Sequence, residues 1–199
     1  MSQHSTNHLD PRAPLVLDTR DLARSPGSMR ALNRVVPAPK DLGLELIGVP
    51  QGADLTLDLT MQSVSEGVYV SGTATAPLEG ECGRCLRPID DTLVVNIAEL
   101  YAYENSTTME TTEEDEVGRV QDDLIDLEPV LRDAVVLALP VNPVCRQDCP
   151  GLCPECGASW DDLPADHSHQ QDDPRWAALS KLDLPSELGQ PSQLTTNEE

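Results

Sequence analysis

Alternating apolar and polar residues mark a β-rich block between about residues 14 and 103. The clearest run has leucine or methionine at every second position, at Leu55, Leu57, Leu59 and Met61. After a turn at residues 65–67, small or β-branched residues alternate again, at Val68, Val70, Gly72 and Ala74. A period of two predicts strands with one buried face, and the turn between the runs predicts a hairpin.

Two further segments of this block are predicted to be strands. Residues 15–17 form a short candidate strand, and residues 93–103 form a longer one. Residues 80–88 lie between the hairpin and the longer strand and carry the pair Cys82-Gly-Arg-Cys85. We therefore expect this pair in a turn that joins two strands of an antiparallel sheet.

One strong helical pattern follows the strands. Apolar residues recur at helical spacing, at Leu127, Val130, Leu131, Ala134, Val135 and Ala138. Asp126 is the expected N-cap, and Pro140 ends the helix. A second, short helix is predicted from Asp173, as its N-cap, to Leu182.

These elements predict an α+β fold, an antiparallel β-sheet or partial barrel with one main packed helix and a C-terminal Cys-rich zinc-binding segment. Only five residues are aromatic, so the core must come from Val, Leu, Ala and Ile. We expect a disordered N-terminus over 1–12 and an α+β core over 13–140. A Cys/His metal-binding segment with the short helix would occupy 141–183, and a disordered tail 184–199.

Charge limits the partners. Thirty-five acidic and thirteen basic side chains give a net charge of −22, which excludes general binding to nucleic-acid backbones. Six basic residues nevertheless lie within residues 12–40, where the local charge is +4 (six basic, two acidic), leaving −26 elsewhere. Either this segment is a solvated arm whose arginines pair with the acidic body, or residues 24–30 contact a phosphate or a partner. The candidate partner-binding residues are Arg20, Arg24, Arg30 and Arg34.

Residues 104–123 are acidic and of low complexity. The composition is typical of an exposed loop, and it also suits a docking site for a basic protein.

The cysteines carry the main chemical signal. Besides the pair at 82 and 85, four fall within twelve residues, at Cys145, Cys149, Cys153 and Cys156. Two thiols two residues apart and followed by glycine, as in Cys153-Pro-Glu-Cys156-Gly157, are typical of a knuckle that points both sulfurs at one metal ion, most often zinc. Disulfides or reduced structural thiols are the alternatives.

Nothing in the sequence favours the disulfide alternative. Residues 1–10 contain no basic region followed by an apolar core, and the longest apolar runs, such as 134–139, are too short to cross a bilayer. We therefore expect a cytoplasmic protein whose cysteines stay reduced.

Motifs for catalysis are missing. The sequence contains no GxSxG, GxxxxGK[ST], HExxH or GxGxxG pattern. Cys-rich ligation favours a closed structural metal site over an open catalytic one. We do not expect an enzyme, and the alternative is a zinc-dependent or thiol-redox enzyme.

Four stretches together resemble the YceD family, the large ribosomal RNA subunit accumulation proteins, in its high-GC Gram-positive branch. They are residues 80–88 with the first cysteine pair, 126–140 with the helix, 143–157 with the cysteine cluster, and 173–179. The resemblance implies a non-enzymatic role in accumulation of large-subunit ribosomal RNA and ribosome assembly. The implied partners are a ribosomal precursor particle or a basic ribosomal protein, with weak or no binding to naked RNA and no membrane.

The resemblance also bears on the metal ligands. Some relatives end the cysteine cluster with Cys-x-Cys where this chain has His167-Ser-His169, and imidazole can replace thiolate on zinc. One or two zinc ions are expected. The preferred arrangement has two sites: Cys153, Cys156, His167 and His169 hold one ion, and Cys82, Cys85, Cys145 and Cys149 hold the other. The alternatives are a single site of Cys82, Cys85, Cys153 and Cys156, or a tight wrap of the four cysteines from 145 to 156.

Overall fold

The computed structural model of the chain describes residues 8–22, 25–103, 106 and 118–169. The chain divides into two compact units, Met1–Leu152 and Cys153–Glu199. The division falls inside the predicted segment 141–183. The predicted helix at 173–182 and the predicted tail at 184–199 lie outside the described residues, as do residues 1–7 of the predicted N-terminal segment and most of the acidic stretch.

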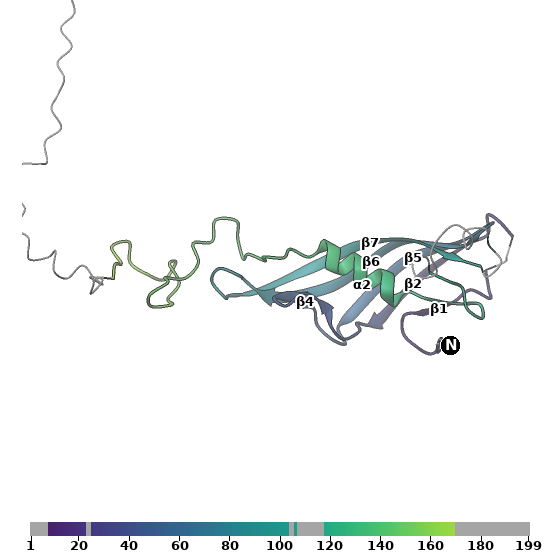
Figure 1. Cartoon of the computed structure of the whole chain (residues 1–199), viewed down its shortest axis with the longest axis horizontal. Coiled ribbons are helices and arrows are strands. Elements are labelled where there is room, and N and C mark those ends of the chain that lie inside the picture. Colours follow the sequence, from purple (N-terminus) through teal and green to yellow (C-terminus); the bar gives the residue numbers. More distant parts are fainter. Residues whose placement is uncertain (1–7, 23–24, 104–105, 107–117, 170–199) are drawn as a thin grey trace, which may run out of the picture. The chain divides into compact units, whose positions relative to one another are not determined.

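The first unit is an α+β structure, as predicted. Its elements are β1 (Val16–Asp18), β2 (Met29–Pro37), β3 (Leu42–Gly43), β4 (Ile47–Val49), β5 (Asp54–Val64), β6 (Gly67–Glu81), β7 (Pro88–Ala102), β8 (Leu124–Asp126) and α2 (Glu128–Ala138). Six strands form an open antiparallel sheet in the order β2-β5-β6-β4-β3, with β7 on the other side of β6 (Figure 1). Strands β1 and β8 form a separate antiparallel pair.

The β5–β6 hairpin confirms the alternation in the sequence. Leu57 and Leu59 of β5 are fully buried, whereas Asp58 between them is exposed. Val64 pairs with Gly67, so the turn consists of only Ser65 and Glu66, and Gly67 already belongs to β6. Alternate side chains point to opposite faces of a strand, and one face of the hairpin therefore supplies the centre of the apolar core.

The β6–β7 hairpin holds the first cysteine pair at its tip. The strands pair along their whole length, from Gly67 with Ala102 to Glu81 with Pro88. Residues 82–87 connect them, which confirms that the cysteine pair joins two antiparallel strands.

Helix α2 packs against β7 and β3 and lies over the sheet in Figure 1. Its buried stripe is Leu127, Leu131, Val135 and Leu139, with a strict spacing of four. Ala138, predicted to face the core, is exposed, and Leu139 takes its place because the helix ends there and the backbone becomes extended.

The start of α2 differs from the prediction by one residue. Asp126 is the last residue of β8, and Leu127 occupies the N-cap position without a side-chain hydrogen bond. The Asp126 carboxylate still accepts a hydrogen bond from the Glu128 backbone N–H at 3.0 Å, so it satisfies one of the free amides of the first turn. The Tyr101 hydroxyl donates to the Asp126 carbonyl at 2.9 Å, and this hydrogen bond holds the residue before the helix against β7.

Part of the basic segment is a strand and not a solvated arm, although Arg20 and Arg30 do pair with acidic residues as that alternative expects. Residues 29–37 form β2, which pairs with β5 over nine residues, from Met29 with Gln62 to Pro37 with Asp54. Arg30 and Arg34 interrupt the apolar face of β2, which is why the pattern did not indicate a strand. Arg24 lies outside the described residues.

Part of the acidic stretch is also structured. Residues 118–120 run beside Ala102 of β7, and Val120 is buried, so this end is not an exposed loop. No helix in the described part of the chain is long and apolar enough to cross a membrane.

Candidate metal centres

The first candidate centre, cluster 1, consists of Cys82, Cys85, Cys145 and Cys149. Their four sulfur atoms lie within 4.8 Å of one another, and three of the four residues are buried. The Cys82 and Cys149 sulfurs are 3.8 Å apart, and those of Cys85 and Cys145 are 3.6 Å apart. All four cysteines are free of disulfides.

These separations fit a metal ion. A tetrahedral zinc ion with Zn–S bonds of about 2.3 Å places its sulfurs about 3.8 Å apart, whereas a disulfide needs about 2.05 Å. Cluster 1 therefore has the donor set and the spacing of a closed four-thiolate site.

The turn after β6 aims Cys82 and Cys85 at the same point. The Leu86 N–H donates to the Cys82 carbonyl at 2.8 Å, and the Cys82 N–H donates to the Arg87 carbonyl at 2.9 Å. Leu86 adopts a left-handed backbone with φ of 58°, a conformation that usually selects glycine. The turn is thus a knuckle in which leucine stands at the usual glycine position.

The segment that carries Cys145 and Cys149 is attached to this knuckle by backbone contacts. The Gly83 N–H donates to the Pro143 carbonyl at 2.8 Å, and the Arg84 guanidinium donates to the Cys149 carbonyl at 3.0 Å. These contacts join residues about sixty positions apart in the chain, and no local pattern of residues indicates them.

The thiols of cluster 1 differ in acidity. Burial disfavours the Cys82 thiolate, but hydrogen bonds from the backbone amides of Cys145, Arg84 and Cys85 outweigh burial and lower the pKa of Cys82 to about 6. Burial, together with thiol contacts, raises the pKa of Cys145 to about 12, and burial also raises the pKa of Cys149. Near neutral pH, the lowered pKa favours the thiolate form of Cys82, which can bind a metal ion without losing a proton. A metal ion would have to displace protons from Cys145 and Cys149.

The second candidate centre, cluster 2, lies in the second unit and consists of Cys153, Cys156, His167 and His169. Their ligand atoms also lie within 4.8 Å of one another. The Cys156 sulfur is 3.7 Å from His167 Nε2, close to the ~3.6 Å expected between sulfur and nitrogen on a tetrahedral zinc ion. Cys153 is buried, whereas Cys156 is exposed and both histidines are partly exposed.

The knuckle of cluster 2 repeats that of cluster 1. The Gly157 N–H donates to the Cys153 carbonyl at 2.8 Å, and the Cys153 N–H donates to the Ala158 carbonyl at 2.8 Å. Gly157 has a φ of 71°, so it occupies the left-handed position that Leu86 occupies in cluster 1. Backbone amides of Cys156 and Glu155 lower the pKa of Cys153 to about 6.

The histidines of cluster 2 are oriented by neighbours. The Glu155 carboxylate lies 3.7 Å from His169 Nδ1, which leaves Nε2 of that ring for a metal ion. The rings of His167 and His169 meet edge to face with centroids 4.4 Å apart, and the Trp160 ring also meets His167 edge to face, with centroids 5.5 Å apart. The sequence analysis did not single out Glu155, although its place inside the knuckle puts it beside the ligands.

The eight candidate ligands thus fall into the two groups of the preferred arrangement. The single site of Cys82, Cys85, Cys153 and Cys156 does not form as a group among the described residues. The tight wrap of the four cysteines from 145 to 156 does not form either, because Cys145 and Cys149 belong to cluster 1 and Cys153 and Cys156 to cluster 2.

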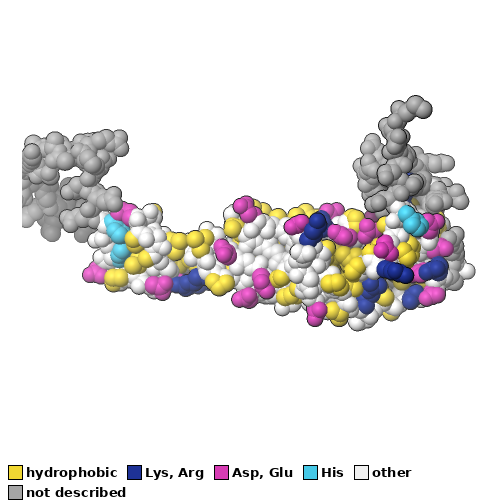
Figure 2. Space-filling model, turned by 90° about the horizontal axis from the view of Figure 1, so that it is seen from below, with side chains coloured by type: hydrophobic (Ala, Val, Ile, Leu, Met, Phe, Trp, Pro, Cys, Tyr) yellow, Lys and Arg dark blue, Asp and Glu magenta, His cyan; other side chains and the backbone are white. Residues whose placement is uncertain are grey.

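The candidate partner-binding arginines have local contacts. Arg20 pairs with Asp18, and the resulting hydrogen bonds lower the pKa of Asp18 to about 2. Arg30 pairs with Asp21 at 3.1 Å, and Arg34 donates to the Pro14 carbonyl. On the face drawn in Figure 2, basic side chains accordingly lie close to acidic ones.

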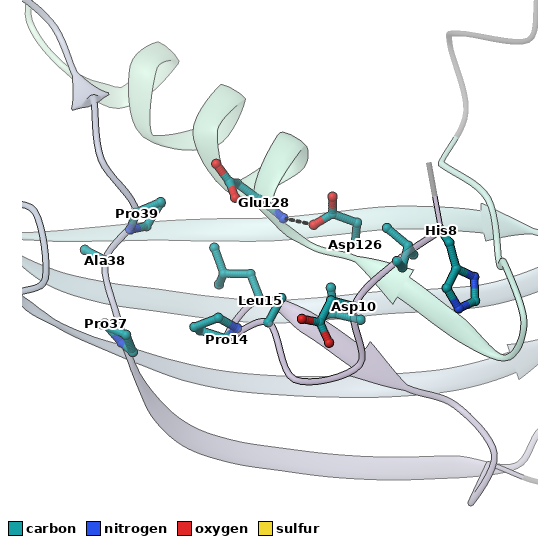
Figure 3. Close-up of a pocket in the computed structure, with 12 residues that line it drawn as sticks. His8, Asp10, Pro14, Leu15, Pro37, Ala38, Pro39, Asp126 and Glu128 are labelled. Carbon is teal, nitrogen blue, oxygen red and sulfur yellow. Dashed lines mark hydrogen bonds between the residues drawn. The ribbon is translucent and has the colours of Figure 1, made fainter. Parts of the chain in front are cut away.

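A cavity of about 330 Å³ lies between the N-terminal segment, residues 37–39 and the start of α2 (Figure 3). Proline, alanine and leucine side chains line it together with three carboxylates. These carboxylates serve local structure: Asp10 accepts from the Arg12 N–H, Asp126 accepts from the Glu128 N–H, and Glu128 pairs with Arg132. We assign no ligand to this cavity.

Comparison with known proteins identifies a family. Residues 70–183 match the sequence model of the family described as large ribosomal RNA subunit accumulation protein YceD. The matched region includes β7, α2 and all eight residues of the two clusters, so both candidate centres lie inside it.

Curated relatives extend the similarity over most of the chain. An uncharacterized protein of Mycobacterium tuberculosis is 54% identical over 170 residues, which cover 85% of this chain and 82% of the relative. An uncharacterized protein of Mycobacterium leprae is 47% identical over 173 residues, covering 87% of this chain and 79% of the relative. The uncharacterized protein YlbN of Bacillus subtilis is 29% identical over 126 residues, covering 63% of this chain and 69% of the relative. No solved structure matches the chain.

Proposed function

Because the chain belongs to the YceD family of large ribosomal RNA subunit accumulation proteins, we propose that it is a non-enzymatic factor that supports accumulation of large-subunit ribosomal RNA and ribosome assembly in the cytoplasm. The observation that carries this proposal is the family match over residues 70–183. The family's name describes an effect on RNA levels, and our proposal adds that this effect comes from binding and not from catalysis.

The candidate metal centres support a binding role. A catalytic zinc ion needs an open coordination position, whereas four protein ligands close a tetrahedral site. We assign one structural zinc ion to Cys82, Cys85, Cys145 and Cys149 and another to Cys153, Cys156, His167 and His169. The zinc ions would hold segments that the apolar core does not reach.

Charge supports a protein partner over naked RNA. The net charge of −22 attracts basic ribosomal proteins and repels phosphate. We confine any RNA contact to Arg20, Arg24, Arg30 and Arg34. A phosphate group there would have to replace Asp18 or Asp21 as the anionic neighbour of Arg20 or Arg30.

Depletion of the protein, followed by sucrose-gradient profiling, tests the proposed function. We expect large-subunit ribosomal RNA to fall relative to small-subunit RNA, and large-subunit precursors to accumulate. Expression of the full chain should restore the profile. An unchanged profile after depletion contradicts the proposal.

A zinc-dependent or thiol-redox enzyme is the competing function, and the lowered pKa of Cys82 and of Cys153 is the observation in its favour. Purified zinc-loaded protein should show no thiol–disulfide turnover with a dithiol substrate and no hydrolysis of model esters or phosphates. Turnover that disappears in Cys82→Ser or Cys153→Ser would favour the enzyme.

A further inference from the structure

The outer edge of β7 is open in the described part of the chain. β7 pairs with β6 through all fifteen of its residues. On its other side, the described residues provide only one bridge, between Ala102 and Arg119 at the very end of the strand. The stretch from Asp90 to Leu100 therefore forms a long edge with no strand beside it among these residues.

The register identifies the backbone groups that point outward along this edge. The Cys82 N–H donates to the Arg87 carbonyl, which makes 82 and 87 a hydrogen-bonded pair, and such pairs alternate along an antiparallel ladder. Odd-numbered residues of β7 therefore bond to β6. The N–H and C=O groups that point away from β6 belong to Asp90, Thr92, Val94, Asn96, Ala98 and Leu100. The Thr92 N–H donates to the Asp91 carboxylate at 2.7 Å, so an added strand has to displace this local contact.

The last residue of β7 confirms this alternation, because both of its outward backbone groups bond to a neighbouring segment. The Ala102 N–H donates to the Gly118 carbonyl at 2.8 Å, and the Val120 N–H donates to the Ala102 carbonyl at 3.0 Å. Residues 118–120 thus run parallel to β7 beside its final residue. A second segment could continue the same ladder from Leu100 toward Asp90.

Apart from acidic side chains near its two ends, the edge lacks the features that usually prevent strand addition. Such features include lysine, an internal proline or a bulge on the edge strand. β7 has no lysine, and its only proline is its first residue, Pro88. Val94, in the middle of the edge, is 59% exposed and offers an apolar contact to a neighbouring strand.

The charges at both ends of this edge are negative. Asp90 and Asp91 are exposed near one end. Glu99 lies near the other end, where burial and the neighbouring carboxylate of Asp133 raise its pKa. A cation placed beside Glu99 and Asp133 would relieve this repulsion.

We propose that the outer edge of β7, from Asp90 to Leu100, is a docking site for an extended, basic segment of a protein partner, which binds as an added β-strand. Backbone hydrogen bonds would provide affinity, and the acidic ends would select lysine or arginine. A second copy of this chain fits less well because each copy carries −22, and RNA is repelled for the same reason. The proposal rests on the proposed function only for the expectation that the partner is a ribosomal protein.

A synthetic peptide tests the edge directly on the zinc-loaded full chain. The probe has about eleven residues, enough to span Asp90–Leu100 at ~3.3 Å per residue, with lysine pairs at both ends and alternating valine and threonine between them. We expect saturable binding by fluorescence anisotropy, and slower amide hydrogen exchange at the six outward-pointing residues. The matched control is the same peptide N-methylated at alternate residues, which keeps its charge but removes the N–H groups that face β7, and it should not bind.

Charge variants of the protein give a second, matched comparison. Asp90→Asn, Asp91→Asn and Glu99→Gln together should weaken peptide binding about tenfold, since three ion pairs at roughly 0.5 kcal/mol each amount to about that factor. The control combines Asp41→Asn, Asp54→Asn and Asp58→Asn, which change the net charge by the same amount at exposed positions outside β7. It should change binding less than about twofold.

Three results would overturn the proposal: equal binding of the N-methylated peptide, equal weakening by both triple variants, or exchange protection at the six residues only when the protein dimerises at high concentration. The last result would assign the edge to a second copy. Failure of the peptide to bind while depletion still lowers large-subunit RNA would reject this site and leave the proposed function standing. Edge-specific binding with an unchanged depletion profile would support this docking site and reject the proposed function.

Discussion

The two candidate metal centres share one backbone device in two different settings. Both knuckles have the same pair of backbone hydrogen bonds and a left-handed fifth residue, Leu86 in cluster 1 and Gly157 in cluster 2. Cluster 1 sits at the tip of a long hairpin, with three buried cysteines packed against Ile89 and Leu152. Cluster 2 is built on turns and is more exposed. The same local motif therefore occurs in one place beside an apolar core and in another place where there is little apolar core.

The difference lies in what else stabilises each region. The first unit contains a continuous apolar core that includes Leu57, Leu59 and Leu131. Residues 153–169 include no strand or helix, and Cys153 is their only buried hydrophobic residue. Metal binding can provide folding free energy where apolar burial is small. We therefore expect metal to be essential for the described part of the second unit and supplementary for the first.

The largest expected effect is loss of structure around cluster 2. Replacing Cys153 and Cys156 by serine should remove one equivalent of zinc and unfold residues 153–169, because structural zinc contributes on the order of 10 kcal/mol. Elemental analysis and hydrogen exchange measure the two effects. The β5–β6 hairpin should keep its exchange protection, and full zinc retention would refute the assignment.

Cluster 1 should show a smaller, local response. Cys82→Ser with Cys85→Ser should remove the other zinc equivalent and release residues 143–149 from the hairpin tip. The ion closes a loop of about sixty residues, and loop closure of that length corresponds to about 4 kcal/mol in the chain-entropy model. Urea denaturation measures this loss. If the whole sheet loses exchange protection instead, the first unit depends on metal as strongly as the second.

The apolar core of the first unit can be weakened without touching either centre. Leu131→Ala should lower the free energy of unfolding by about 3 kcal/mol, because Leu131 is fully buried. Leu137→Ala, on the same helix but 85% exposed, is the control and should cost less than about 0.5 kcal/mol. Both variants should keep two zinc equivalents. Equal stability of the two variants would show that α2 is not packed as described.

The smallest effect is expected when the fifth residues of the two knuckles, leucine and glycine, are exchanged. Leu86→Gly should stabilise cluster 1 by about 0.5 kcal/mol, since it relieves a left-handed leucine that costs about 1–2 kcal/mol and adds glycine entropy of about 0.5–1 kcal/mol. Leu86 is 59% exposed, so little packing is lost. Gly157→Leu should weaken cluster 2 by about 1 kcal/mol. Competition with a chelator measures the zinc affinity of each centre. Weaker zinc binding in Leu86→Gly, or tighter binding in Gly157→Leu, would contradict the common knuckle geometry.

The sequence predicted the elements whose signals are local. The alternation from Leu55 to Met61 indicates β5, and the four-residue spacing from Leu127 to Val135 indicates α2, because one buried face imposes each period. The glycine after Cys156 likewise indicates a knuckle from sequence alone. Strand β2 gave no such signal, since Arg30 and Arg34 interrupt its apolar face at the sheet edge.

An acidic α+β chain with a β5–β6 hairpin, one main helix, two CxxC pairs and a family resemblance can be predicted from the residues alone. Which cysteines meet depends on how the chain folds. Cys82 and Cys85 are joined to Cys145 and Cys149 through contacts such as Gly83 with Pro143, and two residues sixty positions apart carry no local sign of their proximity. The same holds for Leu86, whose left-handed backbone is imposed by the closed turn and not by leucine itself, and for the open edge of β7, which depends on the order of the strands.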